Sequence, residues 1–256
     1  MRETDGVGHM YQSMTWEEIE HAAHVGTPVV IPIGATEQHG RHLPVSTDWV
    51  LPTQILRSAS EMRPIVVGPA LAFGSRSRPG SGGGQLFPGT LSLRATTFMA
   101  VIEDVLLELV RSGFRNLVLY NWHFENVGFV YEPAFLVSGT HPEAKIVVIE
   151  DAMPTLSTEE QNVLWPEGFP GLALEHAAVI ETSLWLYHEP EMVRTQKMQP
   201  DAPERVVRHD VLPIDQSLTT ASGSLSSPVG ATAEKGKLLH DRLVERVVTI
   251  LDTEFS

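Results

Sequence analysis

The amino-acid sequence predicts an α/β fold with three α/β/α layers, in which helices cover both faces of a mostly parallel central sheet. Two observations carry this prediction. Four short runs rich in Val, Ile and Leu are apolar along their whole length, as expected for strands that are buried on both faces. Helical patterns lie between these runs, and the alternation of strand and helix is typical of right-handed βαβ units.

The four predicted strands have turn-forming residues at their boundaries. Each is rich in the β-branched and aliphatic residues that fill a buried parallel sheet. They are residues 28–34 (PVVIPIG), 64–70 (PIVVGPA), 116–121 (NLVLYN) and 144–151 (AKIVVIED).

Three helices are predicted from the spacing of apolar residues. Residues 95–111 repeat apolar side chains at spacings of three and four, and Gly113 follows as a stop signal. Residues 176–188 and 233–255 form the other two helices. Between these two lies a Pro-, Thr- and Ser-rich passage, residues 199–231, with weak periodicity. We expect an ordered excursion or a subunit-contact arm there, because a helix that can pack back on the domain follows it.

Length and composition predict one globular domain over residues 1–256. The hydrophobic fraction of 42% and the charged fraction of 20% are ordinary for such a protein. No run approaches the roughly 18 apolar residues that cross a bilayer. The first residues, MRETDGVGHMYQS, lack the apolar segment of a secretion signal, so we expect a cytoplasmic protein without a membrane partner.

Charge and cysteine content restrict the chemistry further. The net charge is −14 with only 18 Lys and Arg residues, whereas nucleic-acid binding requires clustered positive charge, so no nucleic-acid partner is expected. The absence of cysteine excludes disulfides, thiolate catalysis and sulfur-ligated zinc. Any metal ion must therefore be held by nitrogen and oxygen atoms.

Acidic and imidazole side chains follow two of the predicted strands directly. Glu37, His39 and Asp48 come after the first strand, and His123 and Glu125 come after the third. Ligands of open parallel sheets bind beyond the carboxyl ends of the strands. Residues two apart in extended backbone project to the same side, so each segment can direct one imidazole and one carboxylate at a common point.

These two imidazoles and three carboxylates suit a pair of divalent ions bridged by one acid. Nitrogen and oxygen ligands favour Zn²⁺ and/or Mn²⁺. Two ions about 3.5–4 Å apart would polarise a carbonyl oxygen and lower the pKa of a bridging water, which makes hydrolysis the natural chemistry. A single Glu-x-His or His-x-Glu is more often a polar surface loop, but two of them after two strands are a less probable coincidence.

The remaining histidines receive other interpretations. His42 fits neither pair, and we expect it to order the loop or to support a ligand from behind. The others are expected to be solvent-facing imidazoles: His9, His21, His24, His141, His188, His209 and His240.

Two further segments are candidates for contact with a substrate. The Gly-rich stretch 78–90 lacks the Gly-Lys-Ser/Thr ending of a phosphate loop, so we expect its backbone N–H groups and Ser81 to face a substrate, or else a tortuous surface loop. In LEHAAVIETS, His176 lies at the expected start of a helix. It would either transfer a proton from the attacking water to the leaving nitrogen or cap the helix, and Glu181 would orient a ligand.

Together these motifs resemble the creatininase (creatinine amidohydrolase) family. The resemblance rests on E-x-H-G-x-H-L-P with a following T-D, on SGGG with FPGT, on N-x-H-x-E-N, and on EH followed by ETS, and it extends from about residue 14 to the C-terminus. It implies a three-layer fold, a binuclear Zn/Mn centre and hydrolysis of a small cyclic amide, usually in a homohexamer.

The resemblance also implies a role for each matching residue. Asp48 would bridge the two ions, His176 would transfer the proton and Ser81 would contact the substrate. The implied ligands are Glu37, Asp48 and His123 for one ion and His39, Asp48 and Glu125 for the other, and Glu125 is counted with His176 among the catalytic residues.

Departures from the family pattern lie where the substrate would bind. Phe124 stands where creatininases have Tyr, and Leu172 and Ala173 stand where they have Trp and Asp. Loss of that carboxylate would leave polar atoms of a guanidine-like ring unpaired, at a cost of roughly 1–3 kcal/mol. The predicted substrate contacts are therefore Ser81, Phe124, Leu172, Ala173 and His176, and the substrate is creatinine or a less basic or more apolar cyclic amide.

Two alternatives stay open. One is a hydrolase of formamides or other open-chain amides of the same family, against which Glu125 argues, because those members have glycine at this position. The other is a metal-binding oligomer without turnover, which would have no need of His176 as a proton carrier.

Overall fold

A five-stranded parallel sheet forms the centre of the computed structural model, which describes residues 9–81, 83–151, 153–206 and 209–255. The strand order is β1-β3-β2-β4-β5. The strands are β1 (His9–Met10), β2 (Val29–Ile33), β3 (Val66–Val67), β4 (Asn116–Asn121) and β5 (Lys145–Ile149). The predicted parallel sheet is confirmed, although the strand expected at 64–70 is only two residues long and β1 was not predicted. Residues 1–8, in which no apolar leader was expected, lie outside the described residues.

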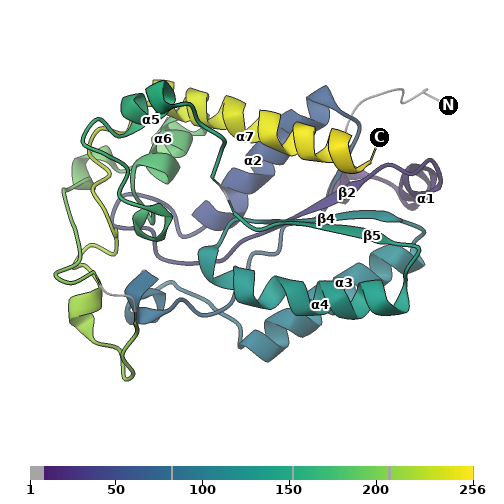
Figure 1. Ribbon diagram of the computed structural model, residues 1–256, viewed down its shortest axis with the longest axis horizontal. Coiled ribbons are helices and arrows are strands. Elements are labelled where there is room, and N and C mark those ends of the chain that lie inside the picture. The colour runs from purple at the N-terminus through teal and green to yellow at the C-terminus, as the bar shows by residue number, and fades with distance from the viewer. Residues whose placement is uncertain (1–8, 82, 152, 207–208, 256) are drawn as a thin grey trace.

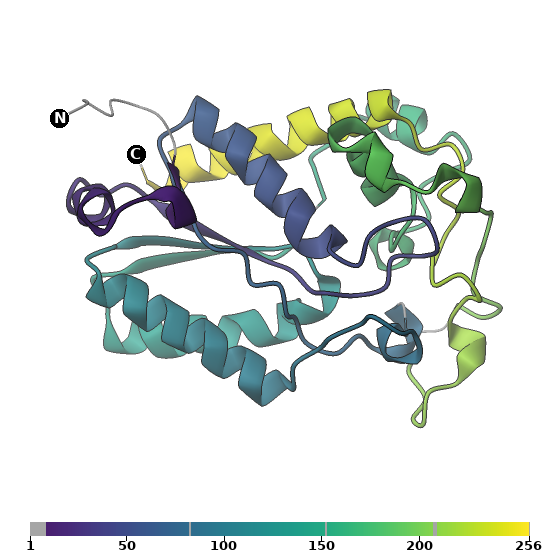
Figure 2. The same cartoon turned by 180° about the vertical axis from the view of Figure 1, so that it is seen from behind.

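Helices cover both faces of this sheet and confirm the three-layer prediction (Figure 1). Helices α2, α6 and α7 lie on one face, over a core that includes Leu51, Leu184 and Leu243. Helices α3 and α4 lie on the other face, where Phe98 and Val130 are buried (Figure 2). The helices are α1 (Trp16–His24), α2 (Thr47–Met62), α3 (Ala95–Arg111), α4 (Val127–Thr140), α5 (Thr158–Leu164), α6 (Val179–His188) and α7 (Ala233–Glu254). None of those in the described part of the chain is both long and apolar enough to span a membrane.

The register of the two central strands places their carboxyl ends at one edge of the sheet. In the β2–β4 pair, Ile33 lies opposite Asn121, so both strands end at the same level. The chain therefore delivers Glu37 and His123 to the same edge a few residues later. This is the geometric basis for the site described below.

Three local predictions near this edge were wrong. No helix was predicted around Asp48, but this residue lies in the first turn of α2. Glu125 lies in a short 3-10 helix, Phe124–Asn126, rather than in extended backbone. The helix predicted from residue 176 begins only at Val179, because Ala177 has the positive φ of 53° and interrupts the helical path.

The passage 199–231 is largely irregular and packs against this same edge. Its described residues form one 3-10 turn, Gln216–Leu218, and bury Leu218 and Leu225. The backbone N–H of Leu225 donates a hydrogen bond to the carbonyl of His176 at 3.0 Å. These contacts support the expected excursion, whereas a role as a subunit-contact arm stays a prediction.

Two neighbouring histidines, His188 and His240, were placed wrongly by sequence reasoning. His188 is only partly exposed, and its Nε2 is buried without a hydrogen-bond partner among the described residues. His240 was expected to face solvent, but only 6% of it is exposed, and its ring lies against those of Tyr187 and His188 between α6 and α7. The two helices approach closely because Gly236 faces the carbonyl of Ser183, where an added Cβ would lie 1.9 Å from the oxygen. The close crossing of the two helices buries this ring.

Candidate metal centre

Four of the five predicted metal ligands are brought together by three elements at the carboxyl edge of the sheet. Glu37 and His39 follow β2, Asp48 projects from the first turn of α2, and His123 follows β4. All four side chains are at least 96% buried. Charged groups are buried in this way only when they are paired with one another or bind a metal.

The first group of donors consists of Glu37, Asp48 and His123, which offer atoms within 4.8 Å of one another. His123 Nδ1 lies 3.0 Å from Asp48 Oδ2 and 3.4 Å from Glu37 Oε2. These are the three residues predicted to hold one of the two ions.

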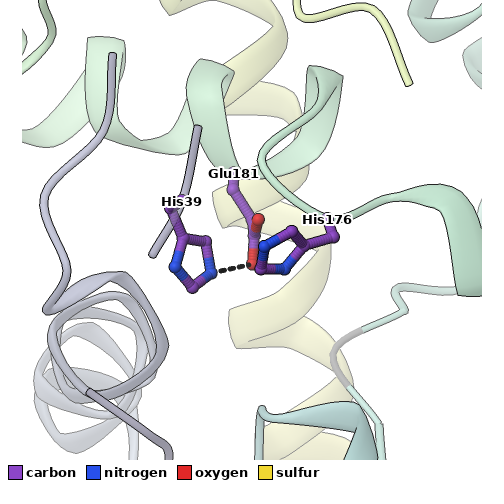
Figure 3. Close-up of side chains that lie close together, drawn as sticks. All are labelled: His39, His176 and Glu181. Carbon is purple, nitrogen blue, oxygen red and sulfur yellow. Dashed lines mark ion pairs between the residues drawn. The ribbon is translucent and has the colours of Figure 1, made fainter. Parts of the chain in front are cut away.

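The second group consists of His39, His176 and Glu181 (Figure 3). His39 Nε2 lies 3.5 Å from Glu181 Oε1 and 3.0 Å from Asp48 Oδ1, and the His39 and His176 rings are 4.4 Å apart. One carboxylate oxygen of Asp48 thus faces each group, which is the position that a bridging ligand requires. Sequence reasoning gave Glu181 only a supporting role. The spacing of five residues between His176 and Glu181 does not show which of the two side chains approaches His39.

Glu125 belongs to neither group. Its Oε2 lies 3.6 Å from His123 Nε2, and its Oε1 accepts a short hydrogen bond from the Ser81 hydroxyl. Glu37 Oε1 accepts a similar bond from Ser77. Ser81 in the Gly-rich stretch and Ser77 just before it therefore hold two of the carboxylates in place, a role that the sequence did not reveal for Ser77.

The crowded carboxylates change the pKa values of both imidazoles. Burial alone would lower the pKa of His123, but Glu37 and Asp48 raise it to about 10. Asp48 and Glu181 likewise raise the pKa of His39 against the effect of burial. Burial raises the pKa of Glu37 to about 7, whereas the two imidazoles hold that of Asp48 well below its usual range. The cluster favours positive charge at its centre.

The donor atoms are arranged to bind metal rather than to form hydrogen bonds with one another. Glu37 Oε2, His39 Nε2, Asp48 Oδ2 and His123 Nε2 are buried and make no hydrogen bond to the described residues. Two of the distances between them and neighbouring donors are only 3.0 Å, but the atoms lack the alignment of a hydrogen bond. Convergent buried donors without mutual hydrogen bonds are what a metal site requires.

His176 is held by a residue that sequence reasoning did not single out. Gln38 Nε2 lies 2.9 Å from His176 Nε2 and donates to the carbonyl of Gly223 at 3.0 Å, while Gln38 Oε1 accepts from the N–H of Gly40. An amide nitrogen only donates, so His176 Nε2 accepts and the neutral ring carries its proton at Nδ1. Burial and the neighbouring His39 lower the pKa of His176 to about 4, so the ring is neutral at pH 7.

His42 lies outside both donor groups, in the supporting position expected for it. Its Nε2 lies 2.9 Å from the Thr182 hydroxyl on α6, and its carbonyl accepts from the N–H of Arg194. It ties the loop after β2 to the helix that carries Glu181.

An inner cavity of about 70 Å³ opens onto the cluster. Its lining includes Asp48, His123 and Glu125 from the metal site and Trp122, whose indole N–H donates to Glu181 at 3.3 Å. All five residues predicted to contact a substrate line it as well: Ser81, Phe124, Leu172, Ala173 and His176. A small molecule in this cavity would contact the donor cluster on one side and Phe124, Leu172 and Ala173 on the other.

Comparison with known proteins agrees with this geometry. The family model for creatininase (creatinine amidohydrolase) matches residues 12–251. Creatinine amidohydrolase of Pseudomonas putida is 37% identical over 251 residues, which cover 94% of this chain and 95% of that protein. Mycofactocin precursor peptide peptidase of Mycobacterium tuberculosis is 30% identical over 240 residues, covering 86% and 82%.

Solved creatininases have the same fold. The crystal structure of creatinine amidohydrolase superposes with a TM-score of 0.92 at 35% identity, over 96% of this chain and 97% of that one. A glutamate-to-glutamine mutant creatininase complexed with creatine matches with a TM-score of 0.91 at 34% identity over 96% and 98%, and Zn–Zn and Mn forms are among the similar structures. The chain is a hydrolase of amide C–N bonds, and it belongs to the creatininase family.

Proposed function

We propose that the protein is a binuclear-metal-dependent amidohydrolase that opens a small cyclic amide, creatinine or a related ring. The observation that carries the proposal is the position of Asp48, whose two carboxylate oxygens lie 3.0 Å from His39 and 3.0 Å from His123. One acid shared by two imidazoles is the arrangement expected for two ions with a common bridging ligand. We further propose a single domain over residues 1–256, a homohexamer and a cytoplasmic location, on the family resemblance and composition.

The metal ligands would divide between two ions, Zn²⁺ and/or Mn²⁺. Bound at this position, the ions would polarise the amide carbonyl oxygen and lower the pKa of water. Ser77 and Ser81 would keep the carboxylates of Glu37 and Glu125 oriented through their hydrogen bonds. The proposed sets are Glu37, Asp48 and His123 for one ion and His39, Asp48 and Glu125 for the other, with Glu181 3.5 Å from His39.

His176 would carry the proton to the leaving nitrogen. Its lowered pKa of about 4 means that an accepted proton is released readily, which suits transfer to an amine. Gln38 would keep the ring neutral and in one orientation until the reaction begins.

The wall of the inner cavity would decide which ring is accepted. Phe124 and Leu172 offer apolar contacts, and Ala173 brings no charge. Unpaired polar groups of a bound ring would weaken its binding, so a neutral cyclic amide suits this wall better than a strongly basic one.

An open-chain amide is the second candidate substrate, because one relative is named as a peptide peptidase. The higher identity to creatinine amidohydrolase favours a cyclic amide. A metal-binding oligomer without turnover is the least supported alternative, since it would have no use for a His176 held neutral by Gln38.

A substrate panel combined with metal analysis tests the proposal. Creatinine, hydantoins, lactams and formamides are screened with added Mn²⁺ or Zn²⁺, using the wild-type chain, Glu125→Gln and the exposed control Glu61→Gln. We expect two ions per chain, turnover of a cyclic amide, and a loss of about 100-fold or more in Glu125→Gln only. Fewer than one ion per chain together with a fully active Glu125→Gln would refute the binuclear site. Turnover of formamides alone would establish the second candidate.

A further inference from the structure

An outer cavity of about 460 Å³ adjoins the inner one and is not explained by the metal chemistry. Phe124 and Leu172, two of the residues expected to decide specificity, line both cavities, so a molecule bound at the metal site can extend past them into the outer space. The outer cavity adds apolar contacts from Val127 and Phe129. It also adds two arginines, Arg76 and Arg78, that the inner cavity lacks.

The two arginines are directed outward by the same segment that holds the metal ligands. Ser75 and Ser77 are buried, and their hydroxyls bond to Asn126 Oδ1 and Glu37 Oε1. Arg76 and Arg78 alternate with them and are exposed. Alternate residues of an extended segment point to opposite sides, so the inward bonds of the serines fix the outward direction of the arginines. The positive charges are thereby placed at a set position relative to the metal site.

Both guanidinium groups are available for a ligand. Within the described ranges neither side chain makes an ion pair or a hydrogen bond, and Arg78 only lies over the ring of Phe124, with its Cζ 5.6 Å from the ring centre. In a chain with a net charge of −14, two unpaired arginines in one cavity are an unusual concentration of positive charge. A planar guanidinium is well suited to bind a carboxylate through two parallel hydrogen bonds.

The acidic residues that share this cavity are already partnered. Asp151 Oδ1 accepts from Arg246 at 2.8 Å, which neutralises its charge locally. Glu150 Oε2 accepts from the Tyr131 hydroxyl at 2.8 Å. A third acid, Glu125, also lines this cavity, but its carboxylate is directed at Ser81 and His123 in the metal site. Glu150 is then the acid left to face the two arginines, so one positive charge remains for a ligand.

We propose that the outer cavity is a subsite for a carboxylate that the substrate carries a few atoms away from the amide to be cleaved, with Arg76 and Arg78 as its binding residues. The inference deepens the proposed function and rests on it, because the cleaved amide must occupy the inner cavity. Ala173 lines the inner cavity at the position where the family resemblance implies an acid, so the inner wall there carries no negative charge that would repel an anionic substrate. The substrate class is a cyclic amide with an acidic side arm.

A pair of matched hydantoins tests this subsite. Hydantoin-5-acetate carries the carboxylate, and hydantoin-5-acetamide is its neutral counterpart of nearly the same shape. Hydrolysis of both is measured with the metal-loaded wild-type chain, Arg76→Gln, Arg78→Gln and the control Arg57→Gln, which is exposed on α2 and lines neither cavity. Binding of both compounds to each protein is measured separately by calorimetry, so that the readout does not depend on turnover.

We expect the wild-type chain to prefer the carboxylate by about ten-fold or more in KM and in affinity, and the preference to weaken as salt screens the charges. Each cavity arginine variant should lose most of the preference, because its values for the acetate fall further than those for the acetamide, while Arg57→Gln keeps the preference. Equal values for the two compounds in the wild-type chain, or equal losses for both in the variants, would overturn the subsite and leave the hydrolase intact. Charge-selective binding without hydrolysis would support the subsite and refute the proposed reaction.

Discussion

Gly84 limits the space around Glu37, and its replacement tests whether that carboxylate is a metal ligand. A Cβ built at Gly84 would lie 2.1 Å from Glu37 Oε1 and 3.0 Å from the Ser77 hydroxyl. In Gly84→Ala the carboxylate must therefore move by about 1.3 Å to reach an ordinary contact of 3.4 Å. Metal–ligand distances tolerate about 0.2 Å, so a displacement of this size removes Glu37 from a bound ion.

The expected magnitudes follow from this displacement. Metal affinity at the site of Glu37, Asp48 and His123 should fall about 10–100-fold, the range seen when the support of a ligand is lost. The additional methyl group should also cost about 1–3 kcal/mol of folding stability, because it overpacks a buried site. Since Gly84 has no positive φ, the effect is steric and not a consequence of backbone strain.

Metal content after equilibrium dialysis against a competing chelator measures the first effect, and thermal unfolding measures the second. Gly139→Ala is the matched control, because its Cβ meets nothing within 4 Å and it lies on the exposed side of α4. Wild-type affinity for both ions in Gly84→Ala, with the fold intact by circular dichroism, would show that Glu37 is not a ligand.

Three further predictions concern protons, specificity and the proton carrier. The pKa of His123 is raised to about 10, so the ring is protonated at pH 7 and must lose a proton when Zn²⁺ binds; the affinity for Zn²⁺ should therefore rise from pH 6 to pH 10. Calorimetry in buffers of different ionisation heat measures the proton release, and binding heats that do not depend on the buffer would contradict it. Ala173→Asp should raise kcat/KM for creatinine about ten-fold or more and leave a neutral lactam unchanged, since it restores a carboxylate to the cavity wall; steady-state assays of both compounds check it. Gly223→Ala places a Cβ 1.9 Å from Gln38 Oε1 and so displaces the side chain that holds His176; kcat should fall at least about ten-fold at unchanged metal content. Gly168→Ala is the control, because Gly168 has a similar φ of 101° and open surroundings, and its kcat should not change.

Local patterns in the sequence predicted three of the five strands, helix α3 and the inventory of donors. Apolar runs without alternation predicted β2, β4 and β5 within one or two residues at each end, and the three-four spacing predicted α3 at its observed bounds. These signals are local, because a buried parallel strand and an amphipathic helix each impose a period on their own residues. Placing Glu37, His39, His123 and Glu125 directly after two strands needed only the rule that the carboxyl ends of parallel strands share one edge.

The support of these donors depends on contacts that form only in the folded chain. Glu181 reaches His39, Gln38 holds His176, and Arg76 points into an outer cavity. Each of these contacts joins residues from separate elements, and some of the partners are more than a hundred positions apart in the chain. No periodic pattern records such contacts, because they depend on where each crossover helix and the irregular passage 199–231 pack, and on left-handed turns such as Ala177 that delay a helix. Short motifs therefore identify the donor residues, whereas the positions of the donors and the extent of the cavity depend on packing.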